Sequence, residues 1–155
     1  MKTSQFTGLV VTLIGFGLAW NVRSQPNNMT LSRNFRPDPI VIEGSAGGNV
    51  SLVKLAGVDA KCRGFASSQP NHVIELSSNF PMLDILAYTN NINDDLTMLI
   101  KDNNGLVICA DDEYQKRYPQ FTRRLRQGTY QIWVGNNEQD KLIRYKLSVS
   151  ESPQK

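Results

Sequence analysis

Short runs in which apolar and polar residues alternate restrict the fold of this chain more than any other feature. In the clearest run, Ile143, Tyr145, Leu147 and Val149 alternate with polar neighbours. A period of two places the apolar side chains on one face of a strand and leaves the other face in water, which is typical of antiparallel sheets. No stretch shows the helical period over a helical length. The pattern therefore predicts an all-β fold.

Turn-forming residues separate eight such runs. Asn104-Gly105 stands between two of them, and this pair tolerates the positive φ angles of a tight hairpin. It predicts that residues 96–101 pair with residues 106–109. About eight short strands with turns between them indicate an antiparallel β-sandwich. The predicted strands cover residues 39–43, 49–55, 72–77, 82–89, 96–101, 106–109, 129–134 and 142–150.

The first 24 residues have the layout of a secretory signal peptide. Lys2 provides a positive start, residues 8–20 form a 13-residue stretch without charge, and Ser24 is a small residue before a cleavage point. The alternatives are a helix buried in the fold and an uncleaved membrane anchor, although a spanning helix needs about 20 apolar residues. The signal peptide predicts export to the periplasm, the thylakoid lumen or the extracellular medium. Membrane contact is expected only if the segment is retained.

Removal of this segment changes the charge that the chain presents to a partner. The 155 residues carry 17 Lys and Arg against 14 Asp and Glu, a net charge of +3. A cut after Ser24 removes two bases and no acid, which leaves 15 bases, 14 acids and a net charge of +1. A nearly neutral domain lacks the basic surface typical of nucleic-acid binding, so no nucleic-acid partner is expected.

The rest of the chain is expected to fold as one domain. Residues 25–38 are polar and contain two prolines, so they are predicted to form an extended or poorly ordered lead-in. Residues 39–151 are predicted to form the sandwich, and residues 152–155 a tail. Cys62 and Cys109 both lie in this exported part, where a disulfide is favoured over a metal site. The alternative is two separate thiols.

Several segments, in order and at matching spacing, resemble the pre-peptidase C-terminal (PPC) domain. They include GTYQIWVG at 128–135 and LTMLI at 96–100, which precedes the Asn-Gly turn. The resemblance extends over residues 44–151 and is greatest to the small exported single-domain proteins common in cyanobacteria. The sequence departs from the family at Gln127, where Pro is usual. The other matching segments are 47–51, 55–57, 62–65, 70–73, 109–112 and 145–149.

The resemblance implies a jelly-roll-like β-sandwich with a non-catalytic role. PPC domains often stand beside secreted proteases, and some relatives bind calcium or extracellular polymers. We therefore expect an exported binding or structural module that recognises an extracytoplasmic protein or polysaccharide, and not an enzyme. One alternative is an accessory or inhibitory partner of a secreted protease. Another is a small extracytoplasmic hydrolase.

Four acidic residues are predicted to meet at one end of the sheet. Asp94 and Asp95 precede one strand of the predicted hairpin, and Asp111 and Asp112 follow the other. Carboxylates on neighbouring loops can supply several of the six to eight oxygens that bind calcium. The alternative is that these residues only form turns, as Asp commonly does. Calcium is the one cofactor that the sequence suggests.

His72 is the single histidine, and it shares the phase of Ile74 and Leu76, so it is expected to face the core. A hydrolase with a Ser-His-Asp site would have to use this residue. No nucleophile motif such as Gly-x-Ser-x-Gly accompanies it. We therefore expect a structural histidine and no catalytic residue.

A basic segment with interleaved aromatic residues, 114–126, is the second candidate binding region. Tyr118, Arg123 and Arg124 lie in it and could bind an acidic polysaccharide or a lipid headgroup. The alternative is a solvated loop balanced by the acids that precede it. Trp133 is out of phase with its apolar neighbours. It is therefore either covered by this loop or exposed as a contact for a sugar or a protein.

Overall fold

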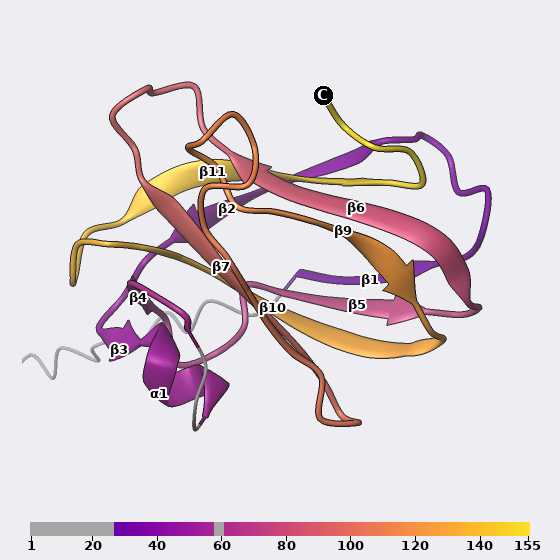
Figure 1. Cartoon of the computed structure of the whole chain (residues 1–155), viewed down its shortest axis with the longest axis horizontal. Coiled ribbons are helices and arrows are strands. Elements are labelled where there is room, and N and C mark those ends of the chain that lie inside the picture. The colour runs from indigo at the N-terminus through magenta and orange to yellow at the C-terminus, as the bar shows by residue number, and fades with distance from the viewer. Residues whose placement is uncertain (1–26, 58–60) are drawn as a thin grey trace, which may run out of the picture.

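The structure, a computed structural model, describes residues 27–57 and 61–155, and the predicted signal peptide over 1–24 lies outside them. The described residues form eleven strands and one short helix. The strands make two sheets that pack face to face (Figure 1). The predicted all-β sandwich is confirmed, with eleven strands in place of eight. Across the two described ranges, no helix is long and apolar enough to span a membrane.

Seven strands form the larger sheet. They are β1 (Asn27–Leu31), β3 (Val50–Ser51), β4 (Phe65–Ala66), β5 (His72–Leu76), β7 (Leu96–Asp102), β8 (Val107–Ala110) and β10 (Gly128–Asn136). The central strand β10 pairs with β5, β4 and β7, and β8 extends the sheet beyond β7. The pairing of β1 with β5 is parallel, and the other paired strands of this sheet are antiparallel.

The smaller sheet has four antiparallel strands. Their order is β2 (Ile40–Ala46), β11 (Ile143–Ser150), β6 (Phe80–Tyr88) and β9 (Gln120–Leu125). The alternation predicted for β11 is confirmed, because Ile143, Tyr145, Leu147 and Val149 are all buried in the core. Burial of each such side chain stabilises the fold by roughly 1.5–3 kcal/mol.

The predicted hairpin is confirmed as β7 and β8. Leu99 lies opposite Cys109 and Ile100 opposite Ile108. The turn uses Gly105 at a φ of 93°, a conformation that favours glycine. Asp102 stabilises the turn because its Oδ1 accepts the backbone N–H groups of Asn104 at 2.8 Å and Leu106 at 2.7 Å.

The strand predicted over residues 49–55 is wrong for most of its length. The chain forms a strand only at β3 and then turns into the helix α1 (Leu52–Ala56). Leu52 and Ala56, four residues apart, are both buried, whereas Val53 and Lys54 are exposed. Residues 52–56 therefore follow a helical spacing in place of the alternation of a strand. Gly57, at a φ of 97°, ends the helix.

The predicted lead-in over residues 25–38 belongs to the folded domain from Asn27 onward. It contains β1, and it buries Leu31 and Phe35 in the core. The predicted tail also packs on the domain, because the backbone N–H of Gln154 donates to the buried Asp84 carboxylate at 2.6 Å. The boundaries predicted at residues 39 and 151 therefore cut through packed structure.

The sandwich has two ends that carry different loops. We call the end with the β6–β7 and β8–β9 loops the loop end. The turn end carries the β1–β2 loop and the β5–β6 and β9–β10 turns, which lie together on the right of Figure 1. Because β9 runs to the turn end, the predicted basic segment is divided between the two ends.

Candidate functional site

An acidic cluster at the loop end is the first candidate site. Asp95, Asp111 and Asp112 each place a carboxylate oxygen within 4.8 Å of the others. The hairpin explains this proximity, since Asp95 precedes β7 and the other two residues follow its partner β8. Asp94 is not part of the cluster. Its Oδ1 accepts a hydrogen bond from Asn91 Nδ2 at 3.0 Å.

Asp111 is the central residue of the acidic cluster. It is half-buried, and its Oδ1 has no hydrogen-bond partner among the described residues. Burial, with the nearby carboxylates of Asp112 and Asp95, raises the pKa of Asp111 from 3.8 to about 6, although Arg63 acts in the opposite direction. The positive charge of Arg63 therefore compensates only part of the burial and of the surrounding negative charge.

The dimensions of the acidic cluster suit a calcium ion. Two oxygens bound to one calcium at about 2.4 Å lie at most about 4.8 Å apart, and the three carboxylates meet this limit. The hard oxygen ligands also fit, because the preferred calcium ligands are carboxylates, carbonyls and water. Glu113 is already engaged, since its Oε2 accepts the backbone N–H of Asp111 at 2.7 Å.

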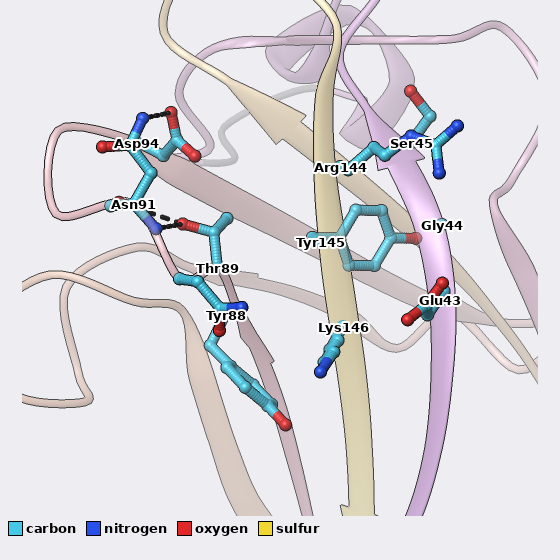
Figure 2. Close-up of a pocket in the computed structure, with 11 residues that line it drawn as sticks. Glu43, Gly44, Ser45, Tyr88, Thr89, Asn91, Asp94, Arg144, Tyr145 and Lys146 are labelled. Carbon is cyan, nitrogen blue, oxygen red and sulfur yellow. Dashed lines mark hydrogen bonds between the residues drawn. The ribbon is translucent and has the colours of Figure 1, made fainter.

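A pocket of about 620 Å³ is the second candidate site, and we call it the outer pocket. It lies on the outer face of β2, β11 and β6, beside the β6–β7 loop (Figure 2). Tyr88, Lys146 and Glu43 stand in one row across its three strands, as the strand register shows. Arg144 lines the next position of β11 opposite Ser45. Strand residues therefore fix both acidic and basic groups around this pocket.

The β6–β7 loop connects the outer pocket to the acidic cluster. Thr89, Asn91 and Asp94 line the pocket, and the next residue, Asp95, belongs to the cluster. Hydrogen bonds within the loop hold it in place: Thr89 Oγ1 donates to the Asn91 carbonyl at 3.0 Å and accepts the Asn91 N–H at 3.1 Å. Tyr118 adds a contact from the β8–β9 loop, because its hydroxyl donates to the Thr89 carbonyl at 3.0 Å.

Two of the candidate binding residues, Tyr118 and Trp133, are buried, so neither is an exposed contact. Tyr118 is 8% exposed, and its hydroxyl supports the β6–β7 loop. Trp133 is 6% exposed, and the cluster that buries it contains residues of α1 and the disulfide but none of segment 114–126. It packs with Leu52, Leu99 and the disulfide on the outer face of the larger sheet. Its orientation out of phase with the core follows from the sequence, but its burial depends on the helix α1, which the sequence pattern did not predict.

The other two predicted binding residues are exposed but do not act together. Arg123 lies over the ring of Phe121 at 5.9 Å and faces a groove beside β8. Arg124, the next residue of β9, lines a different pocket at the turn end. Because adjacent residues of a strand point to opposite sides, the two guanidinium groups serve different surfaces.

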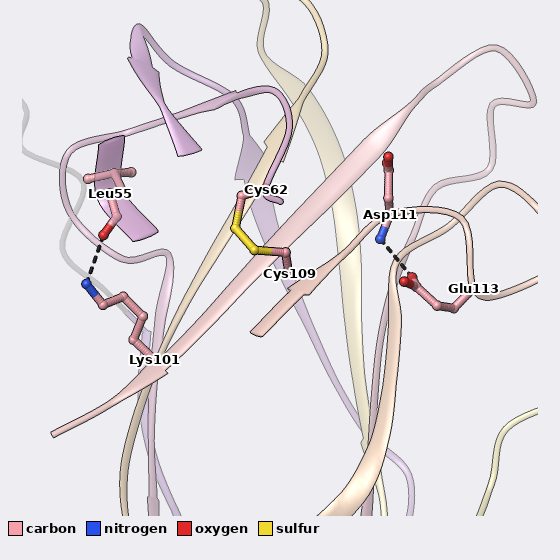
Figure 3. The surroundings of a disulfide bond; sticks show 6 residues. All are labelled: Leu55, Cys62, Lys101, Cys109, Asp111 and Glu113. Carbon is pink, nitrogen blue, oxygen red and sulfur yellow. Dashed lines mark hydrogen bonds between the residues drawn. A yellow bond between two sulfur atoms is a disulfide. The ribbon is translucent and has the colours of Figure 1, made fainter. Parts of the chain in front are cut away.

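The predicted disulfide between Cys62 and Cys109 is present (Figure 3). It connects the segment after α1 to β8 and joins residues 47 positions apart. Lys101 fixes the same region, because its Nζ donates to the Leu55 carbonyl at 2.8 Å near the end of α1. The disulfide thus holds α1 and the segment that follows it against the larger sheet, where they cover Trp133, and we call these residues the cap.

His72 is fully buried between the sheets, as its phase predicts. Its Nε2 is hydrogen-bonded to the Tyr145 hydroxyl at 2.5 Å. Burial lowers the pKa of His72 from 6.5 to about 4, so the imidazole is neutral near pH 7. A side chain sealed in the core has no access to a substrate. The hydrolase alternative, which depends on this single histidine, therefore loses its general base.

Comparisons with known proteins identify the fold. No protein-family model matches the chain, and no curated protein matches it. Its structure is similar to the pre-peptidase C-terminal domain of the collagenase from Bacillus anthracis, with a TM-score of 0.50 and 14% sequence identity, over 84% of this chain and 99% of that domain. Together with the two packed sheets, this similarity shows that the chain has the β-sandwich fold of a PPC domain.

Proposed function

We propose that the chain is an exported, non-catalytic module that binds a polysaccharide in the outer pocket. The observation that carries this proposal is the composition of the pocket wall. Arg144 and Lys146 offer hydrogen-bond donors, Glu43 and Asp94 offer acceptors, and Tyr88 adds an aromatic ring. Sugar hydroxyls both donate and accept hydrogen bonds, so this mixture suits a polysaccharide better than a purely anionic or apolar ligand.

Calcium has a supporting role in the proposed function. An ion held by Asp95, Asp111 and Asp112 would fasten the β6–β7 loop to the β8–β9 loop. The β6–β7 loop forms one wall of the outer pocket through Thr89, Asn91 and other residues. Ordering this wall before the ligand arrives lowers the entropic cost of binding. The ion therefore increases affinity without contacting the sugar.

Export is part of the same proposal. The Cys62–Cys109 disulfide supports it, because such bonds persist in oxidising compartments. The periplasm, the thylakoid lumen and the extracellular medium all satisfy this condition. The similarity to a domain of a collagenase favours a second candidate, an accessory role beside a secreted protease. Recovery of a protease as a stoichiometric partner on immobilised full-length chain would support that candidate.

Calcium is expected to raise the melting temperature of the full-length chain. At a free concentration of a hundred times Kd, binding stabilises the folded state by about 2.7 kcal/mol, which corresponds to a rise of several degrees. The double substitution Asp111→Asn and Asp112→Asn is expected to abolish the rise. Asp94→Asn is the matched control, since it removes a charge from the same end without touching the cluster. An equal rise in melting temperature in the wild type and the double variant, or no rise in the wild type, contradicts calcium binding at this cluster.

Arg144→Gln is expected to weaken polysaccharide binding about tenfold, because it removes a charged hydrogen-bond donor. Affinity electrophoresis through a panel of neutral and acidic polysaccharides measures the effect. Arg123→Gln is the matched control, since it removes the same charge from an exposed strand residue outside the outer pocket. Retardation by no member of the panel, or equal losses in the two variants, would count against this pocket as the binding site.

A further inference from the structure

A pocket at the turn end carries three arginines, and we call it the arginine pocket. Its volume is about 270 Å³, and Arg33, Arg124 and Arg126 line it. Phe80 and Leu125, two buried core residues, are also part of its wall. This pocket lies at the opposite end of the sandwich from the β6–β7 loop and plays no part in the function proposed above.

Each arginine comes from a chain segment that the fold holds in place. Arg33 lies in the β1–β2 loop, which Phe35 anchors by packing against Phe80 with ring centroids 6.4 Å apart. Arg124 belongs to β9, whose neighbour β6 fixes its position. The β9–β10 turn fixes the third residue, because the Arg126 carbonyl accepts the Tyr130 hydroxyl at 2.9 Å.

The same turn is also joined to the β5–β6 turn. The backbone N–H of Gln127 donates to Asn79 Oδ1 at 2.9 Å, and Asn79 itself lines the pocket. Three separate elements are therefore connected around one small opening. The guanidinium groups lie on a preorganised frame, which reduces the entropy lost when a ligand orders them.

The positive charge of the arginine pocket is not balanced by its own wall. No carboxylate belongs to the part of the wall that the structure describes. Among the described residues, the one acid that forms an ion pair with any of these arginines is Glu151, whose Oε1 lies 3.9 Å from Arg33 Nε. Its other oxygen accepts the backbone N–H of Asn34 at 2.7 Å. One carboxylate thus stands against three guanidinium groups.

We propose that the arginine pocket binds a tetrahedral oxyanion, a sulfate or phosphate group. Guanidinium is planar and offers paired donors that match two oxygens of such a group at once. Arg33, Arg124 and Arg126 together present more donors than the two oxygens of a carboxylate can accept. A tetrahedral oxyanion has three or four oxygens and a charge that offsets the excess of positive charge.

The test is a titration of the full-length chain with sodium sulfate and with sodium phosphate, each against sodium chloride at equal ionic strength. The readout is the NMR signal of the arginine Nε–Hε groups, because sulfate and phosphate raise the melting temperature of proteins without binding to a site. Signals of Arg33, Arg124 and Arg126 are expected to move and saturate together. Movement of all arginine signals in parallel would show general screening and would overturn the proposal.

Variants make the assignment specific. The double substitution Arg124→Gln and Arg126→Gln is expected to weaken binding at least about tenfold. Arg117→Gln with Arg123→Gln is the matched control, since it removes the same charge and neither residue lines the arginine pocket or the outer pocket. Equal affinity in the two double variants would overturn the proposal. If Arg33→Gln alone also weakens binding, the site needs the β1–β2 loop as described.

A sulfated tetrasaccharide and its unsulfated counterpart distinguish the source of the group. Tighter binding of the sulfated sugar than of inorganic sulfate, lost in the Arg124 and Arg126 variant, identifies a group carried on a polymer. Equal affinity of the two sulfates identifies the ion itself, and either result supports the oxyanion site. Equal binding of the sulfated and unsulfated sugars, with no response to either inorganic ion, rejects it.

Discussion

Replacing Cys62 and Cys109 together by Ser is expected to lower the free energy of unfolding by about 4 kcal/mol. The bond joins residues 47 positions apart. On the chain-entropy model, a closed loop of this length removes about 14 cal/mol/K of entropy from the unfolded chain, which is about 4 kcal/mol at 25 °C. A protein of ordinary stability has about 5–15 kcal/mol in total, so the loss is a large share.

The loss is expected to begin at the cap over the larger sheet. Cys62 packs with Leu52, Leu99 and Trp133 in a small cluster separate from the main core. Without the bond, α1 is held by this limited apolar contact and by the hydrogen bond from Lys101 to Leu55. Amides of α1 should therefore exchange with solvent before those of β10 in the variant.

Urea unfolding followed by circular dichroism measures the change. Wild-type chain treated with a reductant is the matched control, since it breaks the same bond and leaves every side chain nearly unchanged. Both samples are expected to unfold at lower urea than the oxidised wild type, by similar amounts. A difference below about 1 kcal/mol would show that the disulfide contributes little. If the variant does not fold, the reduced wild type still provides the comparison.

The sequence predicts those parts of the fold in which one element carries its own signal. The apolar alternation of β11 and the Asn104-Gly105 turn are local patterns, and both appear in the structure as expected. The hairpin also predicted the proximity of Asp95 to Asp111 and Asp112, because it brings the flanking residues of both strands to one end. The position of a site that is formed by one hairpin can therefore be predicted from the local sequence of that hairpin.

Elements at the edges of the sheets could not be predicted in the same way. In β9, Arg123 shares the phase of the buried Phe121 and Leu125 but is itself exposed, so a charge interrupts the apolar pattern. An edge strand tolerates this charge because one of its sides faces solvent. β1 has only Met29 and Leu31 as apolar residues, and its pairing with β5 across a long separation supplies the order. Packing overrides weak local preference in both strands.

The candidate pockets were also beyond the reach of local patterns. Arg33 and Arg126 are far apart in the sequence. They line one pocket because the segments that follow β1, β5 and β9 all lie at the turn end.

The space occupied by the Tyr145 ring also depends on a distant residue. Gly44 stands opposite Tyr145, and a Cβ at this position would lie 2.5 Å from the Tyr145 hydroxyl. The missing side chain gives the ring the space to reach His72.

Acidification from pH 6.5 to about 4 is expected to destabilise the fold by about 3 kcal/mol through His72. Burial lowers the pKa of this residue from 6.5 to about 4. Within this window the unfolded chain binds a proton at His72 and the folded chain does not, so stability falls as the pH falls. Each pH unit costs about 1.4 kcal/mol. Above the window neither state is protonated there, and below it both are, so the loss is confined to the window.

The Tyr145 hydroxyl stays protonated throughout, because burial raises the pKa of Tyr145 above its ordinary value of 10.0. Asp111 acts in the opposite direction. Burial and neighbouring carboxylates raise the pKa of Asp111 from 3.8 to about 6, so the folded chain binds an extra proton there and gains stability as the pH falls. Measurement in an Asp111→Asn background, without added calcium, removes this opposing effect.

The matched comparison is His72→Gln in that background, with the free energy of unfolding measured by urea titration at several pH values. The Gln amide can still hydrogen-bond to Tyr145 but does not titrate, so the difference between the two chains should shrink by about 3 kcal/mol as the pH falls through the window. A constant difference would contradict the prediction. NMR titration of the imidazole provides an independent check, since a folded chain whose His72 signal titrates near pH 6.5 would place this side chain in contact with solvent rather than in the core.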